Sequence, residues 1–527
     1  MPISIENIKS RINNSVATNK NDLYNSNIYW SQKPYNICDI LIEELSEPND
    51  IVYDPFLGSG VTLLEAIKKN YNRIGYGCEI NSAPIFIVKT LLNNYDSDKY
   101  KKISESFLKE IKKLQKYYIT KCVDCDSEGI ITSVIFDKPS RNAEIEIKTI
   151  NYRCNCSSKM TKSCDLDDIS KINVNHELKN ISDDILIENS KLAVYENQPI
   201  SQIFTKRNFA VIDEVIGIIN DLEYYNDIFK YILMSVLHLC KITDKHSNSQ
   251  WPLWIPKEDC VEKNVIDVLE KKVKSFSKTI NYINNNYDSN KNYKLIHKGS
   301  QYITQEDIPD NSVQLIITDP PYLGQVAYSE YMQLYKPFLN LEFNIEDEIV
   351  VSSAPSRNKT SEDYFELLEK VFEISSKKLK ENGYFCMYFH DSNLDVWDKI
   401  IGLLSKHHIN YVTQIHIPKS NTLKNIISPK KSLNGDCILF FKKDSNVAFE
   451  QKGLESIDEI ESNIIRQARF LVRQKKAMAT PELYDNGLIE ILIQNGWLSK
   501  LASKYKSLVD IFERHLIWNP QLSKWTL

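Results

Sequence analysis

The chain has 527 residues, of which 42% are hydrophobic and 26% are charged, and its formal net charge is −5. This balance is typical of a soluble protein with roughly two to four domains, and it excludes a disordered chain. Because the net charge is negative, a nucleic-acid partner requires local basic patches. The sequence shows neither an apolar run of about 18 residues nor a signal-peptide core, so we expect a cytoplasmic protein without membrane contact.

The first strand–loop–helix unit lies near the N-terminus. Residues 51–53 are typical of a short buried strand, residues 54–60 (DPFLGSG) of a glycine-containing loop, and residues 62–70 of a helix. Residues 73–78 then form a second strand that ends at Glu79. We interpret this as a βαβ unit that binds a ligand at the carboxyl edge of a parallel sheet. The loop fits a dinucleotide, a phosphate or S-adenosylmethionine, and Glu79 is placed to accept hydrogen bonds from a ribose diol.

A long interruption follows, with a cluster of cysteines near its start. A basic amphipathic helix over 101–118 precedes the motif Cys122-x-x-Cys125, and Cys154-x-Cys156 and Cys164 follow. Thiolates at this spacing suit tetrahedral zinc, and the segments between them alternate like a hairpin, as in a zinc ribbon. We expect a structural zinc site on Cys122, Cys125, Cys154 and either Cys156 or Cys164. The alternative is a ribbon-like remnant with free thiols.

A second strand-to-loop unit appears far downstream. Residues 315–317 form an apolar, β-branched strand that ends at Asp319-Pro320-Pro321-Tyr322. Further strands and helices alternate around it and indicate one α/β domain split by an insertion. We expect a catalytic domain that is split into residues 1–95 and 291–445. The insertion, residues 96–290, contains a ribbon at about 118–165 and a helical part at about 200–285. A helical C-terminal module occupies residues 446–527.

The Asp319-Pro320-Pro321-Tyr322 loop suits one kind of chemistry. Methylation of an exocyclic amine requires a nitrogen lone pair that is otherwise delocalised into the ring of the base. The Asp319 carboxylate and the Pro320 carbonyl can each accept one N–H of such an amine, and the two prolines stiffen the turn. Tyr322 can stack on a base extruded from a duplex. Because the chain contains no Pro-Cys dipeptide, we expect direct methyl transfer without a covalent thiolate intermediate.

The two loops together resemble those of amino-group DNA methyltransferases, in particular the adenine-specific DNA methylases that contain a Zn-ribbon. The resemblance implies a class I S-adenosylmethionine-dependent fold, Rossmann-like with a mostly parallel sheet, and an N6-adenine product. It also implies cofactor contacts from a set of residues around the first loop: Lys33, Pro34, Tyr35, Asp54, Pro55, Phe56, Gly58, Ser59, Gly60, Thr62 and Glu79. An acidic residue often follows the glycine at position 299 in this family, and Glu306 or Asp307 could replace it here.

We therefore expect a DNA methyltransferase that acts on a flipped adenine in double-stranded DNA. Restriction–modification or phage defence would be its role, with restriction or defence-system subunits as candidate partners. One alternative keeps the chemistry but changes the target to N4 of cytosine or to a base amine in RNA. Another alternative is a non-catalytic DNA-binding subunit of a defence complex, in which the C-terminal module, similar to a winged-helix or dimerisation unit, would dominate.

Overall fold

A mixed, largely parallel sheet forms the centre of the structure, a computed structural model that describes residues 5–29, 32–246, 253–323, 328–339, 341–417, 430, 433, 435–446 and 455–527. Its seven strands have the order β12-β13-β11-β10-β1-β2-β9, and all neighbours are parallel except β13, which is antiparallel to β11 and to β12. This confirms the predicted α/β class with a mostly parallel sheet. The strands are β1 (Ile51–Asp54), β2 (Ile74–Glu79), β9 (Tyr293–His297), β10 (Val313–Thr318), β11 (Leu379–Phe389), β12 (Ile409–Ile417) and β13 (Asp436–Lys443).

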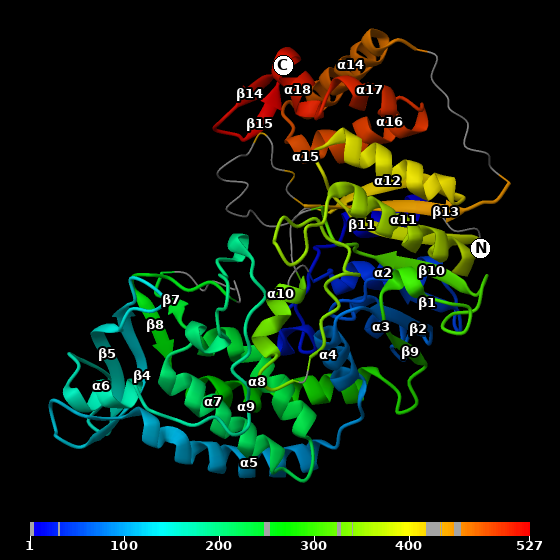
Figure 1. Cartoon of the computed structure of the whole chain (residues 1–527). Coiled ribbons are helices and arrows are strands. Elements are labelled where there is room, and N and C mark those ends of the chain that lie inside the picture. The colour runs from blue at the N-terminus through cyan, green and yellow to red at the C-terminus, as the bar shows by residue number, and fades with distance from the viewer. Residues whose placement is uncertain are drawn as a thin grey trace.

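Helices cover both faces of this sheet, which explains why its central strands are continuously apolar. Val52 and Leu315 belong to the core shared with α2, α3 and α4, whereas Tyr53 and Ile316 belong to the core shared with α11 and α12. Figure 1 shows the two helical layers on either side of the strands. The layers consist of α2 (Tyr35–Leu45), α3 (Val61–Ala66), α4 (Ser82–Leu92), α11 (Ser361–Lys378) and α12 (Leu394–Lys406), and α1 (Ile5–Asn13) packs on α2.

The two loops singled out by their sequence leave the sheet at the same edge. β1 and β10 are parallel neighbours, with Val52 opposite Leu315 and Tyr53 opposite Ile316. The loop at 54–60 follows β1, and Asp319 follows β10. Because both strands run in the same direction, their carboxyl ends bring two segments more than 250 residues apart in sequence into one site.

A second sheet and a layer of helices occupy the region between β2 and β9 (Figure 1). The predicted hairpin forms as β4 and β5, in an antiparallel sheet ordered β6-β5-β4-β8-β7 with β3 paired to β4. The polar segment 163–189 contains a short helix, α6, that starts with an Asp165 capping box. The bounds are α5 (Ser97–Lys112), β3 (Ile119–Lys121), β4 (Glu128–Asp137), β5 (Glu146–Cys154), β6 (Ser157–Lys162), α6 (Leu166–Ile172), α7 (Lys206–Asn220), α8 (Asn226–Cys240), β7 (Thr243–Asp244), β8 (Cys260–Lys263) and α9 (Val265–Asn286).

A buried ion pair joins the helices of this region to its sheet. Arg207 and Glu262 are both 1% exposed, and the guanidinium donates two hydrogen bonds to the carboxylate. Thr205 caps α7 and donates to the same carboxylate over 2.6 Å, while Asn208 donates to the carbonyls of Cys240 and Lys263. The segment from Thr205 to Asn208 therefore ties α7, α8 and β8 together.

The C-terminal residues form a group of helices that packs on α12 and β12. A short hairpin of β14 and β15, absent from our sequence predictions, closes the chain. Among the residues that the structure describes, no helix combines the length and apolarity needed to cross a membrane. The elements are α14 (Ile457–Lys475), α15 (Thr480–Leu483), a π-helical turn (Tyr484–Leu488), α16 (Ile489–Gln494), α17 (Leu498–Lys504), α18 (Leu508–His515), β14 (Ile517–Asn519) and β15 (Lys524–Thr526).

Candidate functional site

The first loop is a glycine cradle at the start of α3. Gly58 and Gly60 have φ values of +52° and +82°, in the left-handed region that favours glycine. A Cβ at Gly60 would lie 2.5 Å from a methyl group of Val88, and one at Gly58 would lie 3.1 Å from the ring of Tyr29. The loop therefore requires both glycines, because each has a positive φ and a Cβ at either position would press on a packed side chain of the protein.

Glu79 is tied to this loop by the backbone. Its carboxylate accepts hydrogen bonds of 3.0 Å from the N–H of Gly58 and of 3.0 Å from the N–H of Asn81. Burial, with smaller contributions from Glu348 and Asp54, outweighs these two hydrogen bonds and raises the pKa of Glu79 to about 7. The carboxylate at the end of β2 is thus held in a fixed position beside the glycines, with a pKa close to neutral pH.

Asp54 lies beneath the loop rather than at its surface. Its carboxylate is fully buried, forms an ion pair of 3.2 Å with Lys33, and accepts hydrogen bonds from Thr318 and from the N–H of Phe56. Asp54 and Asp319 outweigh the effect of burial and raise the pKa of Lys33. Asp54 thus ties the ends of β1 and β10 together, and Lys33 lies between the two loops.

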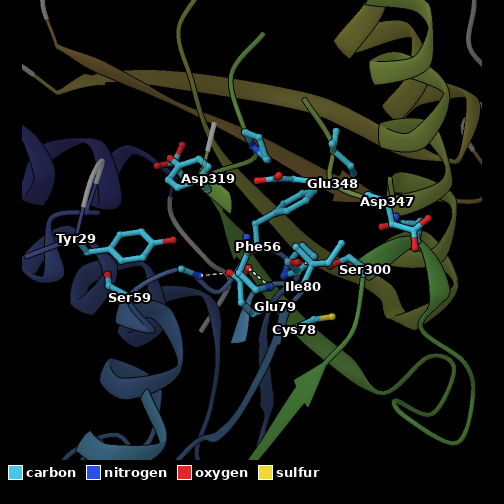
Figure 2. Close-up of a pocket in the computed structure, with 18 of the residues that line it drawn as sticks. Tyr29, Phe56, Ser59, Cys78, Glu79, Ile80, Ser300, Asp319, Asp347 and Glu348 are labelled. Carbon is cyan, nitrogen blue, oxygen red and sulfur yellow. Dashed lines mark hydrogen bonds between the residues drawn. The ribbon is translucent and has the colours of Figure 1, made fainter. Parts of the chain in front are cut away.

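Asp319 and Pro321 line the same pocket as the glycine loop. Figure 2 shows Asp319 facing the cavity together with Tyr29, Phe56, Ser59 and Glu79. The Pro321 carbonyl accepts a hydrogen bond of 2.6 Å from the hydroxyl of Tyr364 on α11, which anchors the turn. Burial, followed by the charges of Asp319 and Asp436, raises the pKa of Tyr322.

The remaining residues of the sequence-based set do not all reach this pocket. Lys33, Pro55, Phe56, Gly58, Ser59, Glu79, Asp319 and Pro321 line it. Asp54 and Thr62 are buried below it, with the Thr62 hydroxyl donating to the carbonyl of Ile317. Pro34, Tyr35, Gly60, Pro320 and Tyr322 are also outside its lining.

Sequence reasoning missed many of the residues that line the pocket. These residues come from five separate segments of the chain and are Tyr29, Ile80, Asn81, Ser300, Gln301, Tyr328, Asp347, Glu348 and Ile349. Tyr29 stacks on Tyr328 with ring centroids 6.1 Å apart.

The acidic residue near Gly299 is neither of the two candidates from the sequence, Glu306 and Asp307. Asp307 binds Lys298 and Thr304 and is not part of the pocket lining, and neither is Glu306. Asp347 lines the pocket instead, beside Ser300 (Figure 2), and accepts a hydrogen bond of 2.6 Å from the Tyr302 hydroxyl. A segment far downstream thus supplies the carboxylate at this end.

Four cysteines gather at one end of the second sheet. The Sγ atoms of Cys122, Cys125, Cys154 and Cys156 all lie within 4.8 Å of one another. Within the described residues this is the one group of potential metal ligands with such spacing, and Cys164 lies outside it. The turn after β3 and the turn between β5 and β6 carry the two pairs, as suits a tetrahedral thiolate site.

Comparison with known proteins gives one family and two relatives. The model of a family described as DNA methylase, N6_N4_Mtase, matches residues 5–90 and 313–506, more than half of the chain. The type II methyltransferase M.BglII of Bacillus subtilis is 31% identical over 104 residues, 20% of this chain and 25% of that protein. The type II methyltransferase M.HindIII of Haemophilus influenzae is 48% identical over 46 residues, 9% of this chain and 15% of that protein. The chain thus aligns with a quarter or less of the length of these curated relatives.

Proposed function

The chain belongs to the family of N6 and N4 DNA methylases, and on this premise we propose that it methylates the N6 amine of a flipped adenine within a specific sequence of double-stranded DNA. The observation that carries this proposal is the meeting of the two loops. Phe56, Gly58 and Glu79 line one pocket together with Asp319 and Pro321, although they come from distant parts of the chain. The type II methyltransferases among its relatives favour a role in restriction–modification or phage defence.

The pocket suits S-adenosyl-L-methionine as the methyl donor. The glycine loop lines the pocket through Gly58, and Glu79 presents a fixed carboxylate to which a ribose diol can donate. Lys33 and Phe56, with the backbone of Ser59, would complete the contacts. When bound there, the donor supplies a methyl group on a positively charged sulfonium.

The residues of the second loop would prepare the amine. The Asp319 carboxylate would accept one N–H of the adenine amine and the Pro320 carbonyl the other, which concentrates the lone pair on the nitrogen. Tyr364 holds this turn through the Pro321 carbonyl, so the acceptors are positioned before the base arrives. Asp319 would take the proton that the nitrogen loses as the new carbon–nitrogen bond forms. Tyr322 would stack on the extruded base.

The Cys122, Cys125, Cys154 and Cys156 group would hold a structural zinc ion. Four thiolates leave no position for a catalytic water, and the group lies in the second sheet rather than at the donor pocket. Zinc would fix the two turns relative to each other. We propose that the region carrying it contacts the DNA target.

The test is methyl transfer in vitro followed by identification of the modified nucleoside. Purified protein is incubated with tritiated S-adenosyl-L-methionine and either genomic DNA or RNA, and the nucleic acid is digested. We expect N6-methyladenine in DNA. The Asp319→Ala variant should lose the activity while retaining DNA binding in a mobility-shift assay, and Glu306→Gln, which removes an exposed carboxylate outside the pocket, should be fully active.

Each other outcome identifies another function. N4-methylcytosine, or a methylated base in RNA, would replace the adenine proposal but keep the chemistry. DNA binding without any transfer by the unmodified protein would favour a non-catalytic subunit. Transfer that survives Asp319→Ala would refute the role of that carboxylate.

A further inference from the structure

The donor pocket contains a buried carboxylate that the proposed methyl transfer does not use. The Glu348 side chain is 6% exposed and lies on the pocket wall formed by residues 347–349. One of its oxygens accepts a hydrogen bond of 3.2 Å from the N–H of Ser329, and the other binds the guanidinium of Arg357. Glu348 is therefore held in one orientation from outside the cavity.

Arg357 is shared between two carboxylates. Its side chain is fully buried and donates to both oxygens of Glu330, which is also fully buried, as well as to Glu348. One positive charge facing two carboxylates leaves an excess of negative charge in the group. Burial lowers the pKa of Arg357, but Glu348 and Glu330 outweigh it and raise that pKa, so the guanidinium stays charged.

The charged groups that line the pocket are mostly acidic. Among the described residues, the lining contains the carboxylates of Glu79, Asp319, Asp347 and Glu348 and one ammonium group, that of Lys33. Lys33 already forms an ion pair with Asp54, which lies below the pocket. The cavity therefore favours a cationic ligand.

Three of these carboxylates lie near Tyr29. Burial comes first among the causes that raise the pKa of Tyr29, followed by the neighbouring Glu79, Tyr328, Glu348 and Asp319. The ring of Tyr29 lies against Gly58 of the cradle. In Figure 2, Glu348 and Glu79 lie on either side of Phe56, with Asp319 toward Tyr29. Glu348 thus lines the same cavity as the glycine loop and Asp319, in the neighbourhood of Tyr29.

We propose that Glu348 is a further donor-binding residue, which selects the cationic methyl donor over its product. This rests on the proposed function, because the donor must occupy this pocket. During transfer the carbon–sulfur bond breaks, the carbon–nitrogen bond forms, and the sulfur keeps the electron pair of the broken bond. The sulfonium becomes a neutral thioether. S-adenosylhomocysteine therefore lacks the electrostatic attraction to Glu348 that the cationic donor has. Glu348 would thereby favour both donor binding and product release.

The experiment measures the binding of donor and product to the full chain by isothermal titration calorimetry. We expect the unmodified protein to bind S-adenosyl-L-methionine more tightly than S-adenosylhomocysteine. Glu348→Gln should weaken donor binding about tenfold, the effect of one carboxylate at several ångströms in a partly screened site, and change product binding less than about twofold. Glu346→Gln removes an exposed carboxylate two residues away, outside the pocket, and should change neither.

An analogue with a protonated amine in place of the sulfonium keeps the inference testable if the variant does not fold. The unmodified protein should bind it more tightly than S-adenosylhomocysteine. Equal loss of donor and product affinity in Glu348→Gln, no loss of either, or product binding as tight as both cationic ligands would overturn the role of Glu348. Absence of binding by all three ligands would instead overturn the proposed function.

Discussion

The pKa of Glu79 predicts that donor binding depends on pH near neutrality. Its carboxylate must be ionised to accept hydrogen bonds from the ribose diol, and burial raises its pKa to about 7 in the free protein. The fraction of ionised Glu79 therefore rises from roughly a tenth at pH 6 to roughly nine tenths at pH 8. The dissociation constant of the donor should thus fall about tenfold between these two values. At pH 7, binding should release about half a proton per site.

The raised pKa of Glu79 also determines how the stability of the free folded chain changes with pH. Because the pKa of Glu79 lies above its usual value of 4.5, the free folded chain holds a proton that the unfolded chain releases between pH 4.5 and 7. Ionisation of Glu79 therefore destabilises the free fold as the pH rises through this window, and the donor offsets that loss. Calorimetry at pH 6, 7 and 8, in buffers with different ionisation enthalpies, measures both the affinity and the released protons. A dissociation constant that stays within twofold from pH 6 to pH 8, without proton release, would refute the reasoning.

Three further predictions concern the framework of the site. Arg207→Met should lower the free energy of unfolding by about 3–5 kcal/mol, because Glu262 is left charged and buried, and the added substitution Glu262→Met should restore most of this loss. Urea denaturation measures the stability of both variants. Equal stability of the single and the double variant would contradict the role of the ion pair. Gly60→Ala should cost about 1–3 kcal/mol from its positive φ and the contact with Val88, and Val88→Ala should relieve only part of that loss in the same assay. Metal analysis should find one zinc ion per chain in the unmodified protein and in Cys164→Ser, and no zinc in Cys154→Ser. Loss of zinc in Cys164→Ser but not in Cys154→Ser would show that the ligands are misassigned.

Local patterns predicted the parts of the fold and the site that depend on neighbouring residues. The strand at 51–53, the glycine loop and Glu79 lie within one βαβ unit, and the apolar residues 315–317 identify the strand before Asp319. That both loops meet at one edge followed from the parallel direction of their strands. A capping box created the helix α6 within a polar stretch that hydrophobic periodicity could not distinguish from loop.

Long-range packing decided the rest of the site. Asp347 and Glu348 enter the pocket from an irregular segment, and Tyr29 reaches Gly58 from before the first strand, so no periodic pattern marks them. Asp54 has the expected position in sequence, but its side chain turns below the loop toward Lys33, which only the packing of β1 against β10 reveals. Likewise, the turn after β5 brings Cys156 rather than Cys164 to the other three thiols.

The contact of α8 with α4 has a consequence for engineering this protein. α8 belongs to the expected insertion at residues 96–290, yet it packs against α4, which precedes the insertion, and its side chains share one continuous hydrophobic core with the strands β1 and β10. Excision of residues 96–290 to make a minimal catalyst would therefore expose apolar side chains of α4. Exchange of the region 96–290 between homologues should accordingly succeed only when the grafted region brings its own α8, or when the exposed face of α4 is redesigned to be polar.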